Sequence, residues 1–212
     1  MHICDAYDCD IDGWPIVGPT DTVPEKLITF QVKGGDKDGF AHFFIDDYRF
    51  ECVWRQPERY IDALKRYHGT IAPDFSLYLD MSLQMQRWNS YRSKVLARYW
   101  QDNGIDVIPC ISWSDDRSFE FAFRGWPECS TVAVSTVGVM QNDDARQLFI
   151  LGLHEMFRQL RPQRLLVYGA SPDLDDVMIP VFRFQNDNQR RVKQWEDVER
   201  QADRAAAAQG RQ

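Results

Sequence analysis

Short apolar segments rich in β-branched and aromatic residues alternate with segments of helical periodicity along most of this chain. The run FAHFFI, residues 40–45, is apolar at nearly every position. Such runs are typical of strands buried on both faces, in parallel sheets that helices cover. Six further segments have strand character: 27–32, 70–75, 106–113, 131–139, 164–169 and 178–184. The alternation predicts an α/β fold with a mainly parallel sheet and right-handed crossovers.

Local signals predict helices between these segments. Pro57 suits the first position of a helix over residues 57–67. Proline has no backbone N–H, and at the first position of a helix this group would have no partner within the helix. A longer helix is predicted over residues 82–103, with Gly104 directly behind it. Its apolar stripe is expected to consist of Leu83, Trp88, Tyr91, Val95 and Tyr99.

Capping residues predict two more helices. Ser114, Asp115 and Asp116 suit a helix N-terminus, where side-chain oxygens meet unpaired backbone N–H groups. Asn142 or Asp143 is expected to cap a later helix in the same way.

The number of strand segments permits a small or incomplete TIM-like (βα) barrel, and an open doubly wound sheet is the rival architecture. No strand segment is followed by GxGxxG or GxxxxGK[ST], so neither phosphate-binding pattern supports the rival. We expect an extended lead-in over residues 1–24, one α/β domain over 25–186 and a charged, partly helical tail over 187–212.

The composition is that of a globular protein with an acidic surface. The formal net charge is −7, which argues against broad binding to nucleic acid, because phosphate neutralisation needs clustered Lys and Arg. The five cysteines form no CxxC pair, which is typical of reduced thiols in a cytoplasmic protein. No stretch approaches the roughly 20 apolar residues that span a bilayer, so we expect no membrane partner.

Polar residues follow the predicted strands at the points where they end. The carboxyl ends of parallel strands lie on one rim, where ligands gather in α/β folds. The candidate catalytic residues are Asp46, Asp47 and Asp74. The candidate ligand-binding residues are Arg49, Ser76, Asn89, Arg92, Trp113, Ser114, Ser135 and Tyr168.

Each candidate has a structural alternative. Two carboxylates on opposing strand ends can act as nucleophile and general acid in glycosyl transfer, or hold a divalent cation such as Mg²⁺. An Asp after a strand can equally cap a helix or brace a loop. Arg49 is either an anion clamp or an ion-pair partner of Asp46 or Asp47, and Trp113 is either a stacking platform or core. No dedicated metal site is predicted from the spacing of possible ligands.

Several long stretches resemble one family of proteins. They are HFFIDDYRFECVW, PERY, PDFSLYLDM, QRWNSYRSKVLARYWQDNGIDVIPCISWSD, SFEFAF, VAVSTVGV and VYG, between Asp12 and Gly169. The sequences of these motifs and their order along the chain resemble those of the domain of unknown function family DUF4417, which is associated with bacteria, phages and mobile elements. This chain departs from the pattern at MSLQMQ, where a proline is expected after the methionine, and at Cys110, where Thr is expected.

The resemblance implies a mobile-element setting, in which proteins replicate or modify DNA or counter host defence. The layout of the strand-end Asp residues also resembles phage base-exchange enzymes related to tRNA-guanine transglycosylases, although this chain lacks their zinc cysteines and glycine-rich loop.

Three function classes stay open. The first is an enzyme acting on a glycosidic or phosphate-bearing, nucleotide-like substrate. The second is a non-catalytic protein that captures a nucleotide signal or a host protein. The third is an accessory replication protein that contacts nucleic acid. The negative net charge argues against this third class, because it disfavours binding to phosphates.

Overall fold

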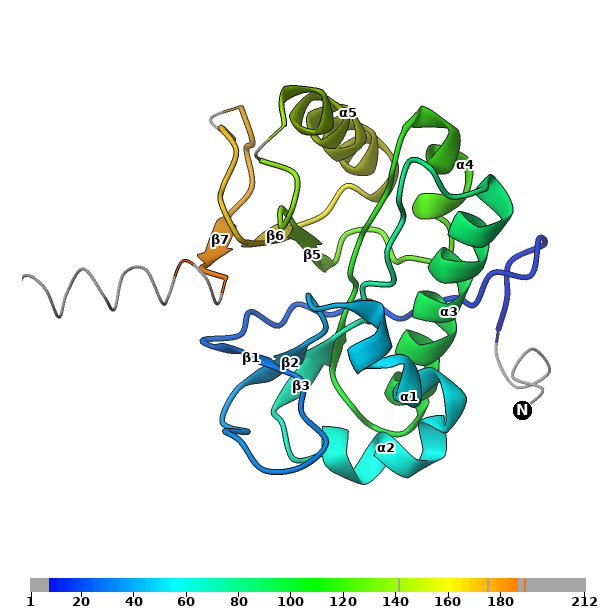
Figure 1. Ribbon diagram of the computed structural model, residues 1–212, viewed down its shortest axis with the longest axis vertical. Coiled ribbons are helices and arrows are strands. Elements are labelled where there is room, and N and C mark those ends of the chain that lie inside the picture. Colours follow the sequence, from blue (N-terminus) through cyan, green and yellow to red (C-terminus); the bar gives the residue numbers. More distant parts are fainter. Residues whose placement is uncertain (1–7, 141, 175, 187–188, 190–212) are drawn as a thin grey trace, which may run out of the picture.

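The computed structural model describes residues 8–140, 142–174, 176–186 and 189 of the chain, and these form two parallel sheets (Figure 1). The first sheet has four strands that follow one another in sequence order. They are β1 (Leu27–Thr29), β2 (Phe40–His42), β3 (Gly69–Ile71) and β4 (Val107–Ile108). Every neighbouring pair is parallel, which confirms the predicted α/β class.

The second sheet continues the same order with three parallel strands. They are β5 (Thr131–Ser135), β6 (Arg164–Tyr168) and β7 (Val181–Phe184). A parallel bridge between Cys110 and Ala133 joins the two sheets, and the Ile111 N–H donates to the Ala133 carbonyl oxygen at 2.9 Å. The carboxyl ends of all the strands therefore lie toward one side of the molecule.

A closed TIM-like barrel is not formed. Within the described ranges no pairing joins β1 to β7, so the sheets stay open. The strands have two to five residues, shorter than the predicted segments, and β4 ends where Pro109 offers no N–H. The interior is nevertheless filled across the sheets, because the Tyr168 ring lies 4.5 Å from the His42 ring and 4.7 Å from the Phe44 ring, centroid to centroid.

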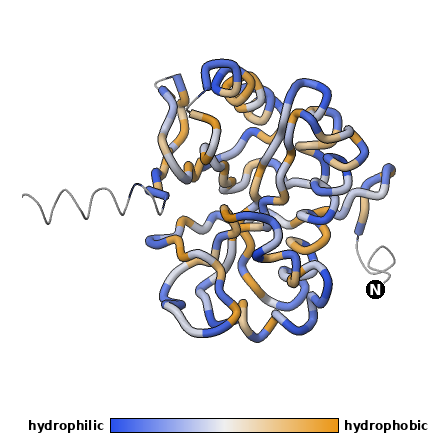
Figure 2. The backbone as a smooth tube through the Cα atoms, in the orientation of Figure 1, coloured by the Kyte–Doolittle hydropathy of each residue, from blue (hydrophilic) through white to orange (hydrophobic). Residues whose placement is uncertain are grey.

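Helices cover the sheets, as the alternation predicts. They are α1 (Glu51–Arg55), α2 (Pro57–Leu64), α3 (Leu83–Asp102), α4 (Phe119–Ala122) and α5 (Asp143–Leu160). Two short 3₁₀ turns, η2 (Asp47–Arg49) and η3 (Asp116–Ser118), precede α1 and α4. Figure 2 shows hydrophilic and hydrophobic residues interleaved along the helices, as expected for helices with one covered face.

Hydrogen bonds confirm the predicted caps Asn142 and Asp115 and show a further cap, Ser82, at the start of α3. The Ser82 hydroxyl accepts from the Met85 N–H at 3.3 Å, and the Asn142 side chain accepts from the N–H groups of Asp144 and Ala145. Asp115 caps η3 by accepting from the Arg117 N–H. Helix α1 was not predicted, because its five residues cover little more than one turn, too few to show a repeating apolar pattern.

The predicted apolar stripe of α3 is wrong at its aromatic positions. Trp88 is exposed, and Tyr91 and Tyr99 are only half-buried. The buried side of the helix is mostly polar instead and consists of Gln86, Asn89, Ser90, Arg92, Ser93, Lys94, Val95, Leu96, Ala97 and Trp100. This buried polar side matters for the site described below.

The described part of the lead-in contains no helix, begins with a tight turn closed by the antiparallel bridge between Cys9 and Pro15, and packs firmly on the domain. Trp14 and Val17 are buried. The Val17 N–H donates to the Gly125 carbonyl oxygen at 2.9 Å, and the Thr131 N–H donates to that of Thr20 at 2.8 Å. The predicted helical tail falls almost wholly on residues outside the described ranges. No helix among the described residues is long and apolar enough to cross a membrane.

The packing of α5 against Trp113 gives a test of the fold. A Cβ at Gly152 would overlap the Trp113 indole. We therefore expect Gly152→Val to lower the free energy of unfolding by about 2–3 kcal/mol, because a filled core cannot absorb the added volume. Urea denaturation measures this loss. Gln147→Val, an exposed position on the same helix, should lose only about 0.5 kcal/mol, the cost in helix propensity. Equal losses in the two variants would contradict the packing.

Candidate functional site

Two adjoining cavities open where the strands end, and we call their shared opening the strand-end mouth. The first cavity has a volume of about 550 Å³ and is lined by residues at or after the ends of β2, β3, β5, β6 and β7. The second, of about 500 Å³, is lined by residues after β3 and β5 and by the segment after β4. The strand-end mouth is defined by Asp46, Arg49, Asp74, Ser76, Ser112, Trp113, Ser135 and Tyr168.

Asp74 lies where the two cavities meet and also lines a smaller one behind them. Its carboxyl group is mostly buried, and this burial raises its pKa to about 6. A hydrogen bond from Ser112 and a weaker one from Cys110 lower the pKa, whereas the charge of nearby Asp47 raises it. A carboxyl group with this pKa is present in both protonation states near neutral pH, so it can give or accept a proton there.

Asp46 and Asp47 have different surroundings although they are adjacent. Asp46 is exposed and lines the first cavity. Asp47 accepts hydrogen bonds from the Ser76 hydroxyl at 2.9 Å and from the Ser76 N–H at 3.2 Å, and it lines neither cavity. Asp47 therefore braces the loop after β3, which is the structural alternative for a carboxylate at a strand end.

Arg49 lines the first cavity from η2 and is exposed. An ion pair with Asp46 or Asp47 was one prediction for this residue. In the portion of the chain described, no carboxylate forms an ion pair with the Arg49 guanidinium. Its positive charge is thus available to an anionic group of a ligand in the mouth.

Asn89 and Arg92, predicted to bind a ligand, line neither cavity and lie beneath the loop after β3. The Asn89 amide donates to the Ser76 carbonyl oxygen at 2.7 Å. Arg92 donates to the Asn89 side-chain oxygen at 2.6 Å and to Glu51 at 2.8 Å. Its guanidinium also lies 3.9 Å from the centre of the Phe75 ring. Both residues support the loop that carries Asp74 and Ser76.

The remaining predicted residues line one or both cavities, and contacts within the protein also hold several of them. Trp113 packs against Phe149 at 5.2 Å between ring centroids, and its indole N–H donates to the Leu148 carbonyl oxygen at 3.3 Å. It is therefore both core and cavity wall. Ser114 donates to the Gln86 side-chain oxygen at 2.5 Å, and the Ser135 hydroxyl accepts from the Val137 N–H at 3.3 Å.

Sequence reasoning missed several lining residues. Ser112 was placed at the predicted rim as a strand-end residue but was not chosen as a ligand-binding candidate, and it donates to Asp74. Tyr78, Val137 and Asn186 lie on loops, whose paths no local pattern predicts. Among the described residues no group of three or more His, Cys, Asp or Glu side chains is arranged to hold a metal ion.

Comparison with known proteins identifies similar chains. The family model described as "Domain of unknown function (DUF4417)" matches residues 9–185. The "Gene 1 protein" of Mycobacterium phage L5 is 39% identical over 186 residues, which cover 85% of this chain and 81% of that protein. The "Gene 1 protein" of Mycobacterium phage D29 is 37% identical over 200 residues, covering 92% of this chain and 74% of that protein. No solved structure matches significantly.

The raised pKa of Asp74 predicts a pH-dependent stability. The folded-state pKa of about 6 lies above the unfolded value of about 3.9, so the folded protein binds more protons between these values. Stability from this group is complete below about pH 4 and is lost as the pH rises through about 6. Asp74→Asn removes the effect and should be about 1–3 kcal/mol more stable than the parent at pH 7.5, but similar at about pH 3.5.

Urea denaturation between these two pH values measures the difference. Asp62→Asn, an exposed position on α2, serves as the matched control and should change stability by less than about 0.5 kcal/mol at each pH. A constant difference between the parent and Asp74→Asn across the range would show that Asp74 titrates normally.

Proposed function

The chain belongs to the DUF4417 family, and we propose that it is an enzyme that cleaves or exchanges a glycosidic bond of a nucleotide-like substrate at the strand-end mouth. One observation carries the proposal. Asp74, a mostly buried carboxyl group, lies where two cavities meet at the strand ends. Perturbed titratable groups in such clefts are characteristic of catalytic sites.

Asp74 is suited to the role of general acid. Burial favours its neutral form, so a substantial fraction carries a proton near pH 6. In the first step the Asp46 carboxylate attacks the anomeric carbon, the glycosidic bond breaks, and Asp74 gives its proton to the leaving group. In the second step water, or an incoming base, attacks this carbon and releases Asp46, while the Asp74 carboxylate takes the proton of the attacking group.

Other residues of the mouth suit the rest of such a substrate. Arg49 supplies a positive charge without a carboxylate partner among the described residues, which favours a phosphate group. Tyr168 and Trp113 offer aromatic surface to a base or sugar ring. The two cavities, of about 550 and 500 Å³, are of the size that small-molecule sites usually have.

A second candidate function is capture of a ligand without turnover. It is favoured by the exposed apolar side chains at the rim, since Tyr78, Leu79 and Val137 are 59%, 53% and 51% exposed. Exposed apolar groups of this kind are common at binding surfaces. The ligand would be a nucleotide signal or a segment of a host protein.

Incubation with a panel of nucleosides and nucleoside monophosphates, followed by chromatography for free base, tests the enzymatic proposal. We expect base release that Asp74→Asn slows by about 10²- to 10⁴-fold, the usual contribution of a general acid. The rate should fall as the pH rises above about 6, because Asp74 must be protonated.

Asp62→Asn is the control and should retain the parent rate. A rate that rises through pH 6, or full activity in Asp74→Asn, would contradict the role of Asp74. Saturable binding of a panel member without any base release would favour the capture function instead.

A further inference from the structure

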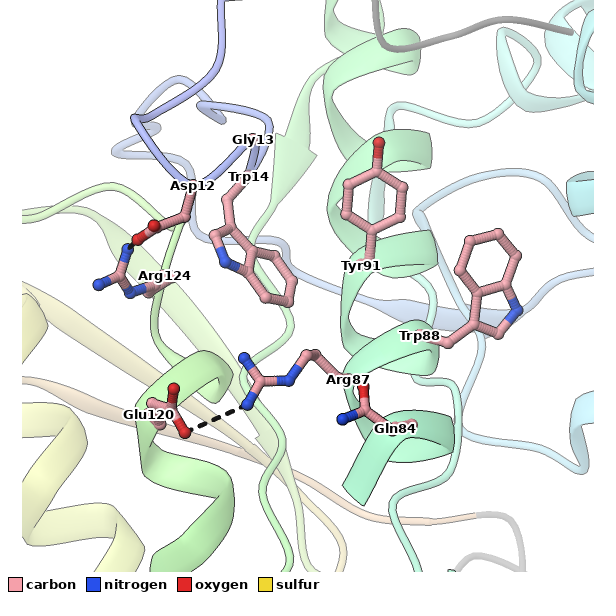
Figure 3. A pocket seen from close by; sticks show the side chains of 9 residues that line it. All are labelled: Asp12, Gly13, Trp14, Gln84, Arg87, Trp88, Tyr91, Glu120 and Arg124. Atoms are coloured by element: carbon pink, nitrogen blue, oxygen red, sulfur yellow. Dashed lines mark hydrogen bonds and ion pairs between the residues drawn. The ribbon is translucent and has the colours of Figure 1, made fainter. Parts of the chain in front are cut away.

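A second pocket lies on the outer side of α3, apart from the strand-end mouth, and shares no lining residue with it (Figure 3). Its volume is about 420 Å³. The lead-in, α3 and the segment around α4 form its walls. It is lined by Asp12, Gly13, Trp14, Gln84, Arg87, Trp88, Tyr91, Glu120 and Arg124. We call it the outer pocket.

Aromatic rings form one wall of the outer pocket. The Trp88 ring stacks on Tyr91 with 6.0 Å between centroids and 20° between planes. Trp14 meets Tyr91 edge-on at 5.9 Å, and Trp54 meets Trp88 edge-on at 5.4 Å. Trp88 is held by these neighbours and is still 49% exposed. A fixed, half-exposed indole of this kind can stack with a flat ring of a ligand.

Paired charges form the opposite wall. Arg87 donates to Glu120 at 3.1 Å, and Arg124 pairs with Asp12 (Figure 3). The positive charges of two guanidinium groups in the lining are balanced by the negative charges of two carboxylates. The outer pocket therefore favours a ligand whose contacting part carries no net charge.

Arg87 places a guanidinium in the lining of the outer pocket. The Arg87 Nε is buried and has no hydrogen-bond partner in the described ranges. Its guanidinium is fixed from two sides, by Glu120 and by the Phe121 ring at 5.0 Å. The Arg87 side chain is 36% exposed, so N–H groups at the end of the guanidinium can donate to an acceptor atom on a bound ligand. The exposed Gln84 adds an amide with both a donor and an acceptor.

We propose that the outer pocket binds a nucleobase. A base has no net charge, presents a flat face for Trp88, and carries ring-nitrogen or carbonyl acceptors for Arg87 and a mixed edge for Gln84. The base belongs either to a free nucleotide or to a single-stranded nucleic acid, since both present the same groups. Both carboxylates of the outer pocket, Asp12 and Glu120, are paired with arginines, and the pocket is assigned binding alone.

Calorimetric titration tests this inference, with the four nucleoside monophosphates and with five-nucleotide single strands of each base as probes. We expect saturable binding of at least one base. Trp88→Ala should raise Kd by about 5- to 150-fold, the range for removal of one stacked ring. Trp88→Phe should restore part of the affinity. Binding of a single strand at least tenfold tighter than of its monophosphate would identify single-stranded nucleic acid as the source, and equal affinities a free nucleotide.

Matched variants separate the outer pocket from the mouth. Because the mouth is also proposed to take these probes, Trp113→Phe marks binding there: binding that Trp113→Phe weakens belongs to the mouth, and binding that Trp88→Ala weakens and Trp113→Phe does not belongs to the outer pocket. Base release is measured separately with Asp74→Asn, so failure of the proposed enzyme and failure of base binding at the outer pocket are distinguishable. Because Trp88 and Arg87 lie on the outer side of α3, circular dichroism should confirm that their variants fold. No saturable binding of any base, or binding unchanged in both Trp88→Ala and Arg87→Gln, would overturn the proposal.

Discussion

The strand-end mouth depends on the buried polar side of α3. The Gln86 amide donates to the carbonyl oxygens of Tyr78 and Met81, at 3.0 and 3.1 Å, and Ser93 donates to that of Pro73 at 2.5 Å. Asn89 donates to the loop between these carbonyls. Buried polar groups must be paired, and residues 73–81 form no regular structure that would pair their own backbone. The helix therefore fixes the path of the loop and, with it, the position of Asp74.

Helix α3 also holds the segment after β2 in place beside the loop after β3. Arg92 reaches Glu51 at the start of α1, directly after the turn that carries Asp46 and Arg49. Since Arg92 is only 8% exposed, loss of Glu51 would leave a buried, unpaired charge, which is strongly destabilising in proteins. The loops after β2 and β3 are thus held by neighbouring positions on one rigid element. A site that needs a fixed arrangement of side chains is best supported in this way.

Local chemistry predicts the order of elements well and the inward side of α3 badly. Pro57, Ser82 and Asn142 mark helix starts through their own backbone and capping preferences, which depend on adjacent residues only. The side of α3 that faces inward depends on distant partners such as Glu51 and the Ser76 carbonyl, so hydrophobicity alone places Trp88 inside and Arg92 outside. The strand-end rule finds Asp74 because it needs only strand direction. It cannot separate Asp46 from Asp47, because the Ser76 contact appears only in three dimensions.

Polar residues inside α3 also shape the outer pocket. Lys94 is buried, and desolvation lowers its pKa to about 7. Its ammonium nitrogen donates to the Ser90 hydroxyl at 2.6 Å and lies 5.0 Å from the centres of both the Trp14 and Trp126 rings. An apolar residue here would avoid the desolvation penalty, but it would lose the contacts that hold Trp14 at the pocket wall. The lead-in is therefore positioned in part by a buried amine, and α3 orders the walls of both pockets through side chains that a purely apolar core would not contain.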